Sequence, residues 1–283
     1  MVRRGEINRY FGKLFGIIIL LIGAIIFILP FMVMVGNSFE TFTFSLPNPP
    51  RILPSKFTLD NYREVIFNYH IFNYFENSII ITMFTTIIVI FISALSAYAF
   101  AKIPFYGREN LFKVYLFTLM IPGVLNIIPQ FLTINVIHLI GTRTGLILLY
   151  VSTGVCGNTF FLKGFFESIP NELLESVVID GGGHGAIFRK IVMPLSKPAI
   201  ATLAILVLLG TWDDFFTAKV ILASQEKVIT LPIMIHRLNG QHATKFGLVF
   251  AAAIITLIPV ILTYIIAQKR FVVGGLTEGA VKE

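Results

Sequence analysis

The chain has little charge, one cysteine and none of the short motifs that hold metals or nucleotides. Charged residues make up 13% of its 283 residues, whereas they make up about a quarter of an ordinary soluble domain. Because Cys156 is the only cysteine, an internal disulfide and a thiolate metal cluster are excluded. The sequence contains no H-E-x-x-H pair and no G-x-x-x-x-G-K-[ST] stretch. We therefore expect no metal site, no directly bound cofactor and no ATP hydrolysis by this chain.

Long apolar runs take the place of charge. Hydrophobic residues make up 56% of the chain and the mean hydropathy is +0.84, which indicates a polytopic membrane protein. The formal net charge is +7, but the basic residues are scattered over loops instead of forming a stripe. They are better explained by orientation in the membrane than by nucleic-acid binding.

We expect an all-α fold with six transmembrane helices. The predicted spans are 14–35, 77–101, 114–137, 144–162, 199–217 and 246–267. The first apolar run is too long for a signal peptide, so we interpret it as an uncleaved span. The predicted parts are 1–76 (tail, first helix and extracytoplasmic segment), 77–270 (five-helix core) and 271–283 (cytoplasmic tail).

The distribution of lysine and arginine predicts the orientation. With the N-terminus inside, the inner segments hold 14 basic residues and the outer segments hold 8. Both termini and the segment 168–198 are therefore expected to be cytoplasmic.

The segment 168–198 is predicted to form a helix, a sharp glycine turn and a second short helix. Ser168 and Pro170 suit the start of the first helix, and Glu172 and Glu175 suit its first turns, where the helix dipole favours negative charge. Glycines 181–183 end it. We call this segment the elbow. If its apolar face docks in another protein, a movement of that protein would be transmitted to the flanking spans.

Polar residues within the spans are candidates for a solute pathway. Pro122 and Pro129 should kink the third span, and Asn126 and Gln130 share a face with Pro122. Polar amides in a span face the bundle interior or a wet cavity, so interhelical hydrogen bonding is an equal alternative. The remaining candidates are Asn158, Trp212 and Asp213. Trp212 beside a carboxylate suits sugar binding, although an interfacial anchor is the alternative.

The elbow resembles the coupling loop of ATP-binding-cassette (ABC) importer permeases. That family has E-A-A, three residues, G, nine residues and I-x-L-P; here Glu175, Gly181, Ile191 and Pro194 match it, while Ser176, Val177 and Met193 depart from it. Other similar stretches are A-Y-A-F-A-K at 97–102, T-W-D-D-F at 211–215 and G-L-T-E-G-A-V-K at 275–282. Together they are similar to the carbohydrate branch, and within it to the maltose-type second (MalG-like) permease.

This resemblance implies the type I ABC importer (MetI-like) fold and a role in sugar or oligosaccharide import. The implied partners are a second permease, a dimer of ATP-binding subunits that uses ATP and magnesium, and an extracytoplasmic solute-binding protein. The implied location is a bacterial or archaeal cytoplasmic membrane. The implied coupling residues are Glu172, Glu175, Ser176, Asp180, Gly181, Ile191 and Pro194. Asp180 has a second interpretation, as a cap for the following turn.

Three other functions remain open from the sequence. The solute could be a polyol or glycerol phosphate. A stand-alone secondary transporter would need an ionisable residue in mid-span, and only Asp213 and Asp214, near the end of a span, come close. A non-transporting membrane assembly protein would explain the hydrophobicity but not the elbow.

Overall fold

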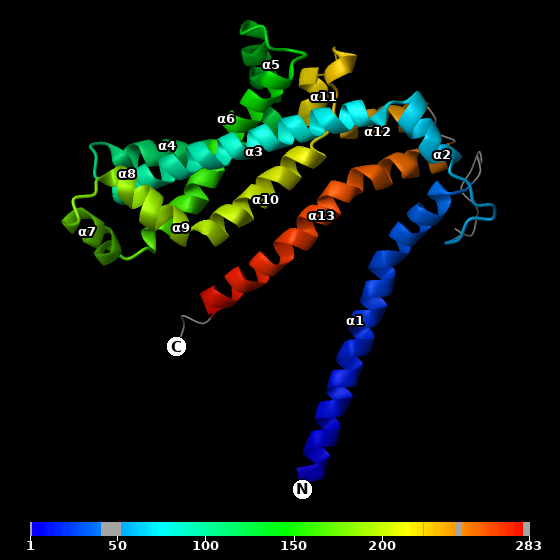
Figure 1. Cartoon of the computed structure of the whole chain (residues 1–283), viewed down its shortest axis with the longest axis horizontal. Coiled ribbons are helices and arrows are strands. Elements are labelled where there is room, and N and C mark those ends of the chain that lie inside the picture. Colours follow the sequence, from blue (N-terminus) through cyan, green and yellow to red (C-terminus); the bar gives the residue numbers. More distant parts are fainter. Residues whose placement is uncertain (1, 41–51, 223, 242–244, 280–283) are drawn as a thin grey trace. The chain divides into compact units, whose positions relative to one another are not determined.

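The computed structural model describes residues 2–40, 52–222, 224–241 and 245–279, with side chains for 12–40, 52–222, 224–240 and 245–266. This part of the chain is almost entirely helical (Figure 1) and contains no β-strand, only an isolated bridge between Glu40 and Phe57. The helices are α1 (Val2–Ser38), α2 (Asp60–Arg63), α3 (Ile71–Lys102), α4 (Arg108–Met120), α5 (Ile127–Val136), α6 (Arg143–Glu167), α7 (Asn171–Ile179), α8 (His184–Ile187), α9 (Met193–Leu195), α10 (Lys197–Asp213), α11 (Phe216–Leu222), α12 (Leu231–Gln241) and α13 (Phe246–Gly279). Short 3₁₀ or π turns lie at Glu64–Asn68, Gly123–Asn126, Phe188–Val192 and Glu226–Val228.

The predicted all-α membrane fold is confirmed. Four unbroken helices are long and apolar enough to cross a membrane: Gly12–Ser38, Ile71–Lys102, Arg143–Glu167 and Phe246–Ile266. Two bent pairs bring the number to six if each pair is one span. The last helix, α13, continues to Gly279 and so includes most of the predicted tail 271–283, whose final four residues lie outside the described part.

The third predicted span is not the single kinked helix that the sequence suggested. Its two halves, Arg108–Met120 and Gly123–Val136, are bent by 95°. Pro122 is the reason, because proline disfavours helical backbone at the residue before it, and Ile121 is extended, with φ −84° and ψ 119°. Pro129 does not bend α5, because it lies in the first turn, where the missing N–H has no intrahelical partner to lose.

The chain forms two compact units, Met1–Ile71 with Ile235–Leu257, and Phe72–Met234 with Ile258–Glu283. In the first unit, the end of α1 is held by α2. Asn61 Nδ2 donates to the carbonyls of Ser38 and Glu40, both at 2.9 Å. The Phe39 ring stacks on Phe57, with centroids 4.9 Å apart.

In the second unit, α3, α6 and α10 run side by side (Figure 1). Two buried clusters hold it together. The first combines α3, α6, α10 and the elbow, and the second combines α3, α5, α6, α11 and the segment that follows α11. Between α3 and α6, Ser93 Oγ donates to the Val155 carbonyl at 3.2 Å. A Cβ at Gly154 would lie 3.3 Å from Val89, so this glycine allows the close approach of the two helices.

Candidate functional site

The elbow bends at a glycine-terminated helix end. α7 ends at Ile179, and Gly181 has φ +78°, the left-handed conformation that glycine adopts without a Cβ clash. The Gly181 N–H donates to the Val178 carbonyl at 2.9 Å, and the Gly182 N–H donates to the Val177 carbonyl at 2.8 Å. These two bonds make a Schellman motif, which satisfies carbonyls at the end of the helix. The predicted helix, glycine turn and second helix are therefore present.

The start and the second half of the elbow differ in detail from the prediction. Ser168 does not cap α7, because its hydroxyl donates to the Phe165 carbonyl at 2.7 Å and Pro170 occupies the cap position. Asp180 is the exposed C-terminal cap residue of α7, while α8 begins after Gly183 with no side-chain cap. The second half is α8, a π turn and α9, and Pro194 lies exposed in α9.

The main apolar face of the elbow packs against this chain's own spans. Ile187 and Val192 are buried in the cluster that contains Leu162, Phe166 and Leu203. Leu174, Val177, Phe188 and Ile191 are partly buried against the same cluster. The elbow is therefore attached to α3, α6 and α10 through an apolar contact.

The end of α3 fastens the elbow with polar contacts as well. Lys102 Nζ donates to the Ile169 carbonyl at 2.7 Å and to Asn171 Oδ1 at 3.0 Å. The Tyr98 hydroxyl lies 3.1 Å from His184 Nδ1. These contacts hold the elbow on both sides of its glycine turn. Sequence reasoning noticed 97–102 only as part of a family pattern and did not connect it with the elbow.

The other face of α7 is exposed. Glu172, Glu175 and Ser176 are exposed, and so are three apolar side chains, Leu173 (43%), Val178 (57%) and Ile179 (85%). We call these six residues the outer face of α7. It combines apolar side chains with two carboxylates near the helix N-terminus. The coupling residues that the sequence predicted thus divide into exposed positions and one half-buried position, Ile191, on the opposite side.

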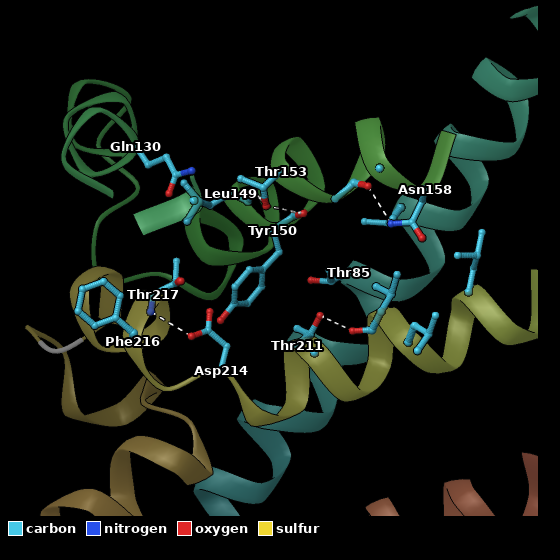
Figure 2. Close-up of a pocket in the computed structure, with 18 of the residues that line it drawn as sticks. Thr85, Gln130, Leu149, Tyr150, Thr153, Asn158, Thr211, Asp214, Phe216 and Thr217 are labelled. Atoms are coloured by element: carbon cyan, nitrogen blue, oxygen red, sulfur yellow. Dashed lines mark hydrogen bonds between the residues drawn. The ribbon is translucent and has the colours of Figure 1, made fainter. Parts of the chain in front are cut away.

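A cavity of about 700 Å³ opens in the same unit among α3, α5, α6, α10 and α11. Its polar lining includes Thr85, Gln130, Tyr150, Thr153, Asn158, Thr211, Asp214 and Thr217, and its apolar lining includes Leu149 and Phe216 (Figure 2). Asp214 Oδ1 accepts the Thr217 N–H at 3.1 Å. The buried Tyr150 hydroxyl points toward this carboxylate (Figure 2).

The structure brings two of the five predicted pathway residues to this cavity. Gln130 and Asn158 line it, whereas Asn126, Trp212 and Asp213 are absent from its lining. Trp212 is 5% exposed, and its ring packs edge-on against Phe75 with centroids 5.7 Å apart. It is therefore a packed core residue in this structure. Asp213, the last residue of α10, is exposed outside the cavity.

Sequence reasoning missed Asp214, Tyr150 and the threonines of the lining. Asp214 was visible as a carboxylate at the end of a span, but nothing indicated that α10 stops one residue earlier and turns Asp214 into the cavity. Thr85 belongs to a stripe of small and hydroxylated residues on the second span, which we interpreted as a helix-packing face, and Tyr150 lies in an apolar run with no distinguishing spacing. Among the described residues, no three histidine, cysteine, aspartate or glutamate side chains group closely enough to hold a metal ion.

Comparison with known proteins identifies the class of protein that this fold and elbow define. Residues 100–271 match the family model for the inner membrane component of binding-protein-dependent transport systems. This match covers more than half of the chain, and the chain belongs to that family. It is a multi-pass membrane permease of the ABC transporter type.

The individual relatives cover nearly the whole chain. It is 32% identical to a diacetylchitobiose uptake system permease of Streptomyces coelicolor, over 92% of this chain and 86% of the relative. It is 36% identical to a trehalose transport system permease of Mycobacterium tuberculosis, over 82% of this chain and 85% of the relative. A crystal structure of a bacterial ABC transporter that imports the acidic polysaccharide alginate shares the fold, with a TM-score of 0.78 and 24% identity over 93% of this chain and 96% of that chain.

Proposed function

We propose that this chain is one permease subunit of an ATP-driven importer of sugars or oligosaccharides. It forms half of the solute pathway. Movement of the ATP-binding subunits reaches its spans through the elbow. ATP and magnesium are bound and used by separate ATP-binding subunits, since the chain has no phosphate-binding loop. A second permease subunit and an extracytoplasmic solute-binding protein complete the assembly in the cytoplasmic membrane.

The two faces of α7 carry this proposal. One face is fixed to the spans by an apolar cluster and by Lys102, and the other exposes Leu173, Val178 and Ile179 beside Glu172 and Glu175. Apolar side chains rimmed by charges are typical of a protein-docking surface. An ATPase that held this outer face would move the spans with it, because the inner contacts leave the elbow little freedom. The excess of basic residues on the predicted inner segments supports a cytoplasmic position for the elbow and both termini, on the side where ATP is available.

The sugar class is supported by the relatives, whose names refer to diacetylchitobiose and trehalose. A cavity lined by amides, hydroxyls and a carboxylate fits the same class, because sugar hydroxyls pair with such groups. A polyol has similar chemistry but offers no ring faces to apolar walls.

The outer face of α7 is the part to test. The chain is purified from its host by an affinity tag, with the subunits that accompany it, and is reconstituted in proteoliposomes. The Ile179→Glu variant places a charge at an 85% exposed side chain, so folding should be unaffected. We expect the variant to lose ATPase co-purification and uptake of radiolabelled disaccharides by about tenfold or more, as for an interface hot spot.

The matched control is Tyr106→Glu, a fully exposed aromatic residue in the loop between α3 and α4. It should behave as wild type. Equal ATPase recovery and uptake in the Ile179→Glu variant and the wild type would contradict the coupling role. Uptake of sorbitol or glycerol 3-phosphate in place of disaccharides would contradict the sugar class alone, and absence of any co-purifying ATPase would overturn the whole proposal.

A further inference from the structure

Two interruptions of the helical backbone meet at the cavity. α4 and α5 are separated by the break at Pro122, and Gly123 and Val124, directly after it, line the cavity. α10 and α11 are separated by the break at 214–215, and Asp214 lines the cavity too. In a membrane protein, irregular backbone is tolerated where it is buried in protein or borders water. Because both breaks border the same cavity, we infer that the cavity is accessible to water.

The polar groups of the cavity have unused hydrogen-bonding capacity. Thr85 Oγ1 is buried without a partner among the described residues. Asp214 uses one oxygen to accept the Thr217 N–H, and its carboxylate can accept further bonds. Asn158 donates Nδ2 to the Gly154 carbonyl at 2.8 Å, so its oxygen remains available as an acceptor. Buried polar atoms without partners are uncommon and call for an explanation; a bound ligand that supplies hydroxyls is one.

The cavity lining carries negative charge only. Asp214 is its only charged side chain, and none of the residues that line the cavity is lysine, arginine or histidine. The remaining walls are apolar, with Val89, Phe161 and Leu203 among them. Apolar walls strengthen the repulsion between this carboxylate and another anion, and the lining offers an anion no cation to pair with. The same carboxylate makes strong hydrogen bonds with hydroxyl donors.

We propose that this cavity is a binding site for an uncharged carbohydrate unit, in which Asp214 accepts sugar hydroxyls and selects against acidic sugars. The proposal rests on the proposed function and deepens it, since it states the charge class of the solute and assigns a solute contact to this subunit. A volume of about 700 Å³ lies in the range of small-molecule sites and accommodates one or two sugar rings.

Cysteine labelling tests the cavity without knowledge of the natural solute. Cys156, the only native cysteine, is replaced by serine. Gly210 is replaced by cysteine, because it lines the cavity and a Cβ there meets no atom within 4 Å. The full chain, with its accompanying subunits, is treated with cationic and anionic methanethiosulfonate reagents, and each rate is divided by the rate with free glutathione.

We expect the cationic reagent to react on the order of tenfold faster than the anionic one, since a charged cleft enriches ions of opposite sign. Asp214→Asn should remove this preference. Asp213→Asn is the matched control, because Asp213 is a neighbouring exposed carboxylate outside the lining, and it should keep the preference. A preference that survives Asp214→Asn, or that Asp213→Asn removes equally, would overturn the proposal.

Protection of the same cysteine tests the ligand class. Labelling by uncharged N-ethylmaleimide is measured with maltotriose, chitotriose, galactotriose or trigalacturonate present. We expect at least one uncharged trisaccharide to slow labelling while trigalacturonate does not, and Asp214→Asn to weaken that protection about tenfold. Protection by trigalacturonate alone, or by no uncharged sugar, overturns the proposal. Since no ATPase is needed in this assay, such a failure would leave the coupling role of α7 intact.

Discussion

The elbow and the cavity lie in the same unit and differ in the polar contacts at their centres, although Ser196 Oγ of the elbow is also buried without a partner among the described residues. At the elbow, Lys102 and Tyr98 use their polar atoms on Ile169, Asn171 and His184. In the cavity, Thr85 holds a hydroxyl that has no partner among the described residues. Satisfied polar groups make a segment rigid, whereas unsatisfied ones are retained where a ligand or water arrives.

This difference assigns a physical task to each region. The elbow has to transmit a displacement, so it needs contacts that do not yield, and it has both a buried apolar cluster and fixed hydrogen bonds. The cavity has to bind and release a solute, so some of its hydrogen-bonding groups must remain unpaired when no solute is bound. A permease needs both properties within one small unit, and Leu203 of α10 belongs both to the cluster that holds the elbow and to the cavity lining.

The strongest way to break the elbow is to disturb its turn. A Cβ at Gly182 would lie 2.6 Å from Val177 Cγ1 and 2.9 Å from the Val177 carbonyl oxygen, so Gly182→Ala must displace the last turn of α7. We expect uptake to fall about tenfold or more, because overpacking of this kind costs on the order of 1–3 kcal/mol. Transport by the reconstituted complex measures the effect.

The neighbouring glycine provides the control for that variant. A Cβ at Gly183 meets nothing within 4 Å, and Gly183 has an extended backbone with φ −91°. Gly183→Ala should therefore transport normally. If the two alanine variants transported equally well, the turn would not be the rigid part that we describe.

A smaller effect is expected where α3 fastens the elbow. Lys102→Met removes the donor to Ile169 and Asn171 and keeps the length of the side chain. The elbow should then open more often, and trypsin should cleave after the exposed Arg189 and Lys190 about fivefold faster, which corresponds to ~1 kcal/mol. Cleavage is followed by gel electrophoresis of the intact complex.

Arg108→Met removes an equivalent charge from the partly exposed pair Arg108–Glu109, whose atoms lie 3.0 Å apart. Exposed pairs contribute little to stability, so cleavage in the elbow should stay at the wild-type rate. Equal acceleration in both variants would mean that loss of charge, and not loss of the Lys102 contacts, loosens the elbow.

The sequence predicted the elbow well because its signals are local. Gly181 has a positive φ that the glycine run anticipated, and α7 ends where the predicted turn begins. The direction of its apolar face could not be predicted, because Leu174 and Val177 pack on α3, α6 and α10, which come from distant parts of the sequence. Amphipathic spacing shows that a face is apolar but not what covers it.

The cavity was much harder to predict because its lining depends on two helix breaks. Pro122 was recognised, but a kink was expected where the helices bend by 95°. No proline or glycine marks the second break, after Asp213, so Trp212 and Asp213 were preferred over Asp214. The choice between adjacent residues at a helix end depends on where the helix stops, and this boundary is the least certain feature of a sequence pattern.

The smallest expected effect separates a ligand site from an ordinary buried hydroxyl. Thr85 and Thr159 both have a buried Oγ1 without a partner among the described residues, but only Thr85 lines the cavity. Replacing an unsatisfied hydroxyl by a methyl group of similar shape does not weaken a fold, so both Thr85→Val and Thr159→Val should keep or slightly raise the melting temperature of the purified complex. Uptake should fall about threefold in Thr85→Val alone, as expected for one neutral hydrogen bond to a solute hydroxyl. Identical uptake in the two variants would mean that the Thr85 hydroxyl has no more contact with the solute than Thr159 has, and would remove the contrast between an elbow held by its own contacts and a cavity that binds a ligand.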